Sequence, residues 1–311
     1  MNIKCLVFFV TIVSSVSIFA EPVVYGKIWI TAESQDREAS RESDLVSNAS
    51  RLGIKGEARI GDGLLGIYQL EYEVDPVDGT ADETKNRTLK QRNSFIGIKG
   101  SKGTVFLGTH DTALKVSQSK VDLFNDLAAE RKNILHGKNQ MKDFIGYTSP
   151  DFSKGFSFTI NAIRDNENQE DHKVGDSKSY SLNFENQNIY ISLAQDLKIK
   201  GYDNSSLSVQ IPINRYSISF IYQESKNIYT GISQEGHIIS LAYALGEKGR
   251  LEMQSGSSDM KIEGGQQTTL GYKYYLSKEF QIFFFISPYK YLPLSNANIQ
   301  KICFRCKYYV F

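Results

Sequence analysis

The feature that most constrains how this chain folds is an alternation of apolar and polar residues with a period of two. Residues 50–61 read SRLGIKGEARIG, in which Arg51, Lys55, Glu57 and Arg59 alternate with mostly small or apolar residues. A period of two is that of a β-strand, whose successive side chains point to opposite faces. The stretch therefore predicts a strand with one charged face and one apolar face.

The same alternation recurs along most of the chain and predicts about sixteen strands. Clear examples are 24–33, 68–74, 156–162, 180–185 and 216–223. Short turns such as 61–63 and 246–249 alternate with long polar loops, and the loop at 109–141 is the longest. Short connections at one end and long ones at the other are typical of an up-and-down barrel in an outer membrane.

A large soluble β-sandwich would show the same alternation, because it also buries one face of each strand. Two features favour a barrel. The apolar faces are rich in Tyr, Phe, Leu and Ile on nearly every strand, and several opposite faces carry charge. A closed sheet of sixteen strands is too wide for side chains to fill, so its interior holds water and its apolar face meets lipid. The predicted fold class is an all-β, transmembrane, antiparallel up-and-down β-barrel.

The first twenty residues, MNIKCLVFFVTIVSSVSIFA, have the pattern of a cleaved signal peptide. Lys4 precedes an apolar run, and small residues precede Ala20. We expect the mature chain to begin at Glu21 and to form one barrel over 21–311. No later apolar run approaches the roughly 18 residues of a membrane-spanning helix, so we expect an exported chain without a helical anchor.

Composition and motifs argue against several other functions. Lys and Arg number 36 against 35 Asp and Glu, so no strong field favours nucleic acid. No G-x-S-x-G, H-E-x-x-H or P-loop pattern occurs, and we expect neither a catalytic site nor a cofactor. Cys303 and Cys306 form a C-x-x-C pair, but positions i and i+3 of a strand face opposite sides. No second pair completes a zinc site, so we expect no bound metal.

Several strings taken together resemble the trimeric general porins of Gram-negative outer membranes, closest to the neisserial type. The resemblance covers residues 21 to about 287. The matching strings are VVYGKIW (23–29), SRLGIKGEARIGDGL (50–64), IYQLEYE (67–73), RNSFIGIKGSKGTVFLGTHDT (92–112), VDLFND (121–126), IGYTSPDFSKGFSFTINA (145–162) and LGYKYYLSKEF (270–280).

This resemblance implies a homotrimer embedded in outer-membrane lipid, with a third loop that folds into the lumen of each barrel. It also implies a pore constriction where acidic residues face basic residues of the wall. The matching wall residues are Lys27, Arg51, Lys55 and Arg92, together with Lys142 and the acidic Glu71. The matching loop acids are Asp122, Asp126 and Glu130.

The resemblance implies a passive channel for ions and small hydrophilic solutes. Opposed charges across a narrow aqueous gap create a transverse field, and clusters of charge set ion selectivity. The wall candidates lean basic, which predicts a mild anion preference. Two other functions stay open: a substrate-specific channel and a non-conducting, adhesin-like barrel. In a third interpretation, the charges only solvate the barrel wall.

The last segment, 288–311, departs from the pattern. Phe311 and Tyr309 fit the terminal strand of an outer-membrane barrel, but Arg305 and Lys307 fall at positions expected to face outward. A bulge would restore the alternation, and the other interpretation is a diverged tail. The pattern therefore leaves open whether the last strand pairs with the first.

Overall fold

The structure is a computed structural model that describes residues 22–37, 40–82, 85–164, 173–261, 265–291 and 295–310. The predicted signal peptide and residue 311 lie outside the described residues, so both stay predictions. Among the described residues, no helix combines the length and the hydropathy that a membrane span requires.

The described chain contains eighteen strands, one short α-helix and one 3-10 helix. The first nine strands are β1 (Val23–Arg37), β2 (Ser40–Ser47), β3 (Arg51–Gly61), β4 (Leu64–Val74), β5 (Leu89–Gln91), β6 (Ser94–Gly100), β7 (Gly103–Asp111), β8 (Gln140–Thr148) and β9 (Phe156–Ile163). The others are β10 (Ser177–Glu185), β11 (Tyr190–Ile199), β12 (Tyr202–Ile213), β13 (Tyr216–Asn227), β14 (Ser233–Leu245), β15 (Gly249–Ser258), β16 (Gly265–Tyr275), β17 (Phe280–Tyr291) and β18 (Ser295–Val310). The helices are α1 (Ala113–Ser119) and η2 (Arg131–Asn133).

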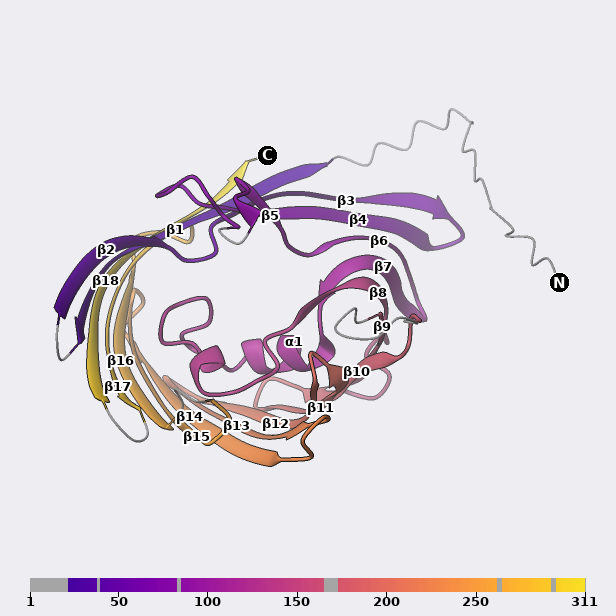
Figure 1. The fold of residues 1–311 in the computed structure, drawn as a ribbon. Helices are drawn as coiled ribbons and strands as arrows, with labels where there is room; N and C mark the ends of the chain where they lie inside the picture. Colours follow the sequence, from indigo (N-terminus) through magenta and orange to yellow (C-terminus); the bar gives the residue numbers. More distant parts are fainter. Residues whose placement is uncertain are drawn as a thin grey trace.

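The strands form one antiparallel sheet in which nearly every strand pairs with its neighbours in sequence. β2 and β3 pair with the two halves of β1, and β5 and β6 both pair with β4. Each of these two pairs is therefore one strand interrupted midway, and the described residues supply sixteen strands around the sheet. This confirms the predicted fold class and strand number, and Figure 1 shows the strands arranged around a lumen.

The last strand pairs with the first. β18 runs antiparallel to β1 from Val24 opposite Val310 to Asp36 opposite Asn298, without a shift in register. Lys307 is the partner of Lys27, and directly opposed residues share a face of the sheet. The outward assignment of Lys307, and with it that of Arg305 at the same parity, is therefore wrong. No bulge is needed at this end of the chain.

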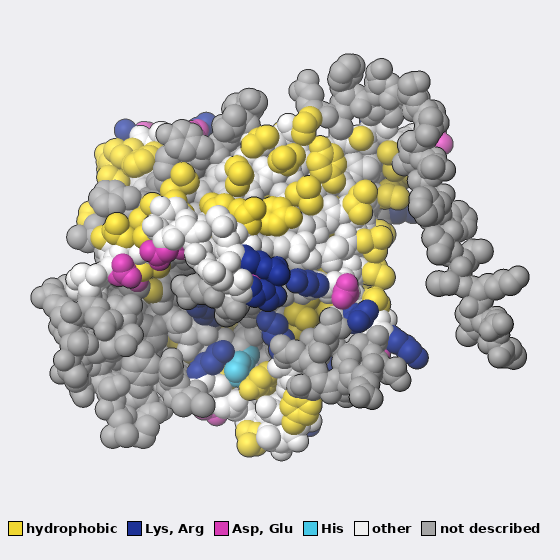
Figure 2. Space-filling view, turned by 45° about the horizontal axis from the view of Figure 1, so that its top comes forward, with side chains coloured by type: hydrophobic (Ala, Val, Ile, Leu, Met, Phe, Trp, Pro, Cys, Tyr) yellow, Lys and Arg dark blue, Asp and Glu magenta, His cyan; other side chains and the backbone are white. Residues whose placement is uncertain are grey.

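The burial pattern is the reverse of that of a soluble protein. Large apolar side chains on the outer face are exposed, such as Leu193, Leu241 and Leu270. Their inward neighbours include buried polar residues such as Ser192 and Ser240. Figure 2 shows apolar side chains spread over the outer wall, with Lys and Arg gathered in the middle of the same view. An apolar exterior around a polar interior is the arrangement that lipid requires.

The third loop, residues 112–139 between β7 and β8, lies inside the ring of strands and carries α1 and η2 (Figure 1). Other connections that the pattern predicted as long loops are hairpins. β11 and β12 pair up to Ile199 and Tyr202, and β13 and β14 pair up to Lys226 and Ser233. Outside the apolar band neither face of a hairpin must be apolar, so the strands continue where the alternation stops.

Candidate pore constriction

One side of the site rests on a break in the second strand around the barrel. β2 ends at Ser47, β3 begins at Arg51, and Ala49 between them has a φ of 50°. The N–H of Trp29 donates to Ser50 Oγ at 2.9 Å, and that hydroxyl lies 3.3 Å from the Trp29 carbonyl oxygen. The serine side chain thus replaces a lost contact of the ladder, and the strand resumes with an arginine.

A second break repeats this arrangement on the other side of β4. β5 ends at Gln91 and β6 begins at Ser94. The N–H of Glu71 donates to Ser94 Oγ at 3.2 Å, and the N–H of Arg92 donates to the Glu71 carbonyl at 2.8 Å. Arg51 and Arg92 are therefore presented from two breaks that flank the same strand.

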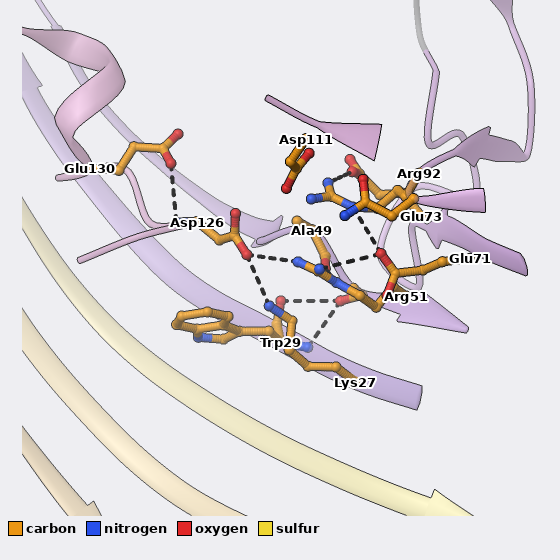
Figure 3. Close-up of polar contacts among 12 residues, drawn as sticks. Lys27, Trp29, Ala49, Arg51, Glu71, Glu73, Arg92, Asp111, Asp126 and Glu130 are labelled. Carbon is orange, nitrogen blue, oxygen red and sulfur yellow. Dashed lines mark hydrogen bonds and ion pairs between the residues drawn. The ribbon is translucent and has the colours of Figure 1, made fainter. Parts of the chain in front are cut away.

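Two carboxylates of β4 lie between these arginines. Glu71 Oε1 is 3.5 Å from Arg51 NH1 and 3.5 Å from Arg92 Nε. Glu73 Oε2 is 2.6 Å from Arg92 NH1. The hydroxyl of Tyr25 donates to the other oxygen of Glu71 at 2.9 Å. Figure 3 shows these side chains converging on one patch of the inner wall.

Asp126 connects the third loop to this wall. Its Oδ2 is 2.7 Å from Arg51 NH2 and 3.2 Å from Lys27 Nζ, and its Oδ1 is 3.2 Å from Lys138 Nζ. Asp126 has a φ of 66°, and its N–H donates to Glu130 Oε2 at 3.0 Å. Glu130 in turn pairs with Lys138 and with Lys132. The loop therefore contacts the wall directly here and does not face it across a gap.

The charge of Asp126 is fixed by its neighbours. Burial alone would raise the pKa of this carboxyl, but Lys27, Lys138 and Arg51 outweigh burial and hold its pKa well below the usual range. Asp126 therefore stays ionised throughout the neutral and mildly acidic range, and so does the contact between loop and wall.

Polar contacts hold the other side of the loop to the wall. Asp122 Oδ1 accepts a hydrogen bond from Gln254 Nε2 at 3.1 Å, and its Oδ2 accepts one from the N–H of Arg131 at 3.1 Å. Lys273 Nζ donates to the Leu123 carbonyl at 3.3 Å. These contacts fix the loop to β15 and β16.

Two apolar clusters hold the loop at its flanks, and we call them the first and second loop clusters. The first consists of Trp29, Phe124, Leu127, Ala129, Phe283 and Phe285. The second consists of Val121, Ile134, Leu135, Tyr190, Ile221, Ile238 and Met260. Each cluster joins residues of the loop to inward-facing apolar residues of the wall. Burial of these side chains is the main source of docking energy for the loop.

The structure brings six of the nine predicted constriction residues into one network. They are Lys27, Arg51, Glu71, Arg92, Asp126 and Glu130. Asp122 lies apart from them, because it accepts hydrogen bonds at the back of the loop. Lys55 lies further along β3, with its ammonium 5.4 Å from the centroid of the Tyr25 ring.

Lys142 also lies apart from the network. The register of β7 and β8 shifts at Thr109, so that this residue opposes both Lys142 and Asp143. This is a β-bulge, which re-aims side chains. Lys142 is exposed and lines a shallow pocket together with Leu107 and Ile145, both of which are exposed on the outer face.

Three members of the network are absent from the predicted set: Tyr25, Glu73 and Lys138. Alternation could have indicated Tyr25 and Glu73, since Tyr25 shares the parity of Lys27 and Glu73 that of Glu71. No pattern in the sequence indicates Lys138, because its position depends on the path of an irregular loop. The wall residues of the loop clusters lie where alternation fails, as in FFF at 283–285.

Comparisons with known proteins agree with this architecture. Major outer membrane protein P.IB of Neisseria sicca is 30% identical over 194 residues, which is 56% of this chain and 52% of that protein. The chain thus spans about half the length of this curated relative. An anion-selective porin from Comamonas acidovorans superposes with a TM-score of 0.75 at 19% identity, over 93% of this chain and all of that one.

A trimer form of OmpT from Vibrio cholerae superposes with a TM-score of 0.65 at 14% identity, over 93% of this chain and 99% of that one. At these identities the two structural likenesses concern the fold. A family model described as Gram-negative porin matches residues 7–291. Because this match spans most of the sequence, the chain belongs to the Gram-negative porin family.

Proposed function

We propose that the chain is a passive diffusion channel of the outer membrane for ions and small hydrophilic solutes, exported through a cleaved segment at 1–20. The observation that carries this proposal is the charged network inside the barrel, where the third loop meets the wall. Its mechanism is electrostatic: fixed charges replace part of the hydration of a passing ion. Porins are a family of channels, and we propose no catalytic role.

We further propose a mild anion preference. Six cations share four carboxylates in the network, since Lys27, Arg51, Lys90, Arg92, Lys132 and Lys138 pair with Glu71, Glu73, Asp126 and Glu130. Lys55 adds a cation, and no carboxylate of the described residues lies within ion-pair distance of its ammonium. The excess of positive charge attracts anions. The anion selectivity of the Comamonas relative is consistent with this preference.

We also propose a homotrimer. The support is the trimer form of the Vibrio relative, which has the same fold. The outer faces of the strands leave extensive apolar surface for lipid and for neighbouring subunits.

Planar-bilayer conductance of the refolded mature chain tests these proposals. Conductance that rises in groups of three steps supports a trimer of open channels, and a salt gradient gives the selectivity. A reversal potential on the cation side overturns the anion preference. A folded, heat-modifiable barrel that does not conduct overturns the channel and favours an adhesin-like barrel. Saturable block by one sugar class favours a substrate-specific channel.

A further inference from the structure

The outer wall over β9 to β13 contains a groove of about 650 Å³. This volume falls within the range of about 300–1,000 Å³ that small-molecule sites occupy. The groove lies on the opposite face of the sheet from the constriction, because its lining includes exposed outward residues such as Ile160, Leu182 and Leu193. No part of the pore uses this surface.

The register of the strands divides the lining into two rows. In the lower row, directly opposed partners follow one another as Phe158, Leu182, Leu193, Leu207 and Tyr222. In the upper row the partners are Ile160, Tyr180, Gln195, Ser205 and Glu224. The rows are two residues apart, or about 7 Å along a strand. Across this step the groove changes from apolar to polar.

The polar end of the groove carries an unbalanced negative charge. Glu224 and Glu235 are direct cross-strand partners, and both are exposed on the outer face. Like charges directly opposite each other destabilise a sheet. The hydroxyl of Tyr222 lies 3.0 Å from Glu224 Oε1 and 2.7 Å from Glu235 Oε2. Neither carboxylate forms an ion pair with a lysine or arginine of the described chain.

The polar end also lies at the edge of the apolar band. On β13 the outward residues from the short turn are Tyr216, Ile218, Phe220 and Tyr222, and Glu224 follows them. The upper row is therefore at the level where the hydrocarbon ends, on the side of the long connections. In an outer-membrane barrel this is the outer leaflet.

We propose that this groove binds one membrane lipid, with an acyl chain along the lower row and a protonated amine of its headgroup at Glu224 and Glu235. The proposal rests on the outer-membrane placement given above but not on conduction. An amine offsets the two carboxylates, and Gln195 and Ser205 offer hydrogen bonds to the polar part of the lipid. Ser205 has the smallest side chain of the upper row, so it leaves the space for the headgroup.

Native mass spectrometry of the refolded full-length mature chain tests the proposal. The probes are phosphatidylethanolamine and phosphatidylglycerol with the same acyl chains, each added to the detergent-solubilised protein. We expect one lipid per chain to be retained, with a preference of about threefold for the ethanolamine lipid, the size expected of an exposed ion pair. The double variant Glu224→Gln with Glu235→Gln should lose the preference and keep the retention.

Ser205→Trp should fill the groove and abolish retention of both lipids. The matched control is Ser257→Trp, an outward serine on β15 outside the groove, which should retain lipid like the unmodified chain. Conductance and heat-modifiability of each variant show separately whether the channel has folded. Equal retention of the two lipids, or unchanged retention in Ser205→Trp, would overturn the proposal. A change in oligomeric state in Ser205→Trp, without a change in lipid, would assign the groove to a second copy of the chain.

Discussion

At the scale of single residues, Asp126 is the contact on which the loop–wall junction depends. One carboxylate neutralises Lys27, Arg51 and Lys138 together, and all four side chains are largely shielded from water. Removing one partner of a shielded ion pair leaves the other charges uncompensated, which costs more than the pair itself contributes.

We predict that Asp126→Asn weakens loop docking by about 3 kcal/mol and raises anion preference. The three cations then face the lumen without their shared counter-ion. The reversal potential in a salt gradient measures the selectivity, and current noise reports loop motion. The control is Glu247→Gln, an exposed carboxylate in the β14–β15 turn. An unchanged reversal potential would show that the passing ions do not sense Asp126.

His136 gives the third loop a pH dependence. Its ring stacks on Tyr202 with a centroid distance of 4.2 Å, and its Nε2 is buried without a hydrogen-bond partner. Burial, with a further contribution from Lys261, lowers the pKa of His136 to about 4. The unfolded chain thus binds a proton near pH 6.5 that the folded chain takes up only near pH 4. Folding stability therefore falls as the pH decreases between these values.

We predict that acidification from pH 7 to pH 4 costs about 1–2 kcal/mol through this histidine, after allowance for solvent screening. The thermal midpoint by circular dichroism at pH 7, 5.5 and 4 measures the loss. His136→Phe keeps a ring to stack on Tyr202 and should show a smaller decrease. Identical pH profiles for the two chains would exclude His136 as the source.

At the scale of elements, the third loop is held by apolar contacts that interrupt the polar lining. Phe124 is fully buried and lies 5.9 Å from the rings of both Phe283 and Phe285. A Cβ built on Gly271 would lie 3.0 Å from the Phe124 ring, so the wall leaves space for this side chain only because residue 271 is a glycine.

We predict that Phe124→Ala weakens loop docking by about 3–4 kcal/mol, the range for a buried aromatic residue. The barrel should still fold, since its strands pair without the loop. Single-channel recordings should show larger noise and closure at lower voltage. Phe152→Ala, at an exposed aromatic of the β8–β9 turn, should leave both unchanged. A quiet channel in Phe124→Ala would mean that the polar contacts hold the loop alone.

The two strand breaks form a second kind of element. Ser50 and Ser94 each complete a ladder from a side chain. Replacing either serine leaves a buried N–H without its acceptor. We predict that Ser50→Ala and Ser94→Ala each cost about 1–3 kcal/mol, measured by urea unfolding, whereas Ser→Thr at either site keeps the hydroxyl. A loss as large in the threonine variants would implicate packing in place of the hydrogen bond.

The alternation predicted the strands well, because lipid outside and water inside impose opposite polarity on every strand that spans the band. It failed in two places for physical reasons. Beyond the band the hairpin of β11 and β12 needs no apolar face, so its residues read as a loop. At Ile221 and Phe283 the inner face meets the third loop in place of water, so the inner face is apolar.

The candidate site could be predicted in part. Arg51 and Glu71 lie on regular strands, where parity and the family resemblance fix the direction of the side chain. Asp122 and Lys142 depend on an irregular loop and on a β-bulge, and neither feature has a period. Lys138 reaches the network only because the loop turns back at Asp126, which adopts a left-handed backbone conformation.

At the scale of the whole molecule, the outer surface determines how the chain sits in a bilayer. Leu241 is exposed in the middle of the outward band of β14, between Ile239 and Tyr243. We predict that Leu241→Arg costs about 2–4 kcal/mol in lipid vesicles, whereas Ser257→Arg, near the edge of the band, costs about 0–1 kcal/mol. Urea titration of tryptophan fluorescence in vesicles measures both. Equal costs would contradict the membrane position deduced from the apolar band.

The sharing of carboxylates among cations also bears on how fast solutes cross. Because Arg51 and Lys27 already have a partner in Asp126, a passing anion finds them partly satisfied and gains little by lingering. A shallow energy well shortens residence time, and throughput in a channel depends on release as much as on capture. The network thus trades selectivity for turnover, as suits a route for mixed nutrients.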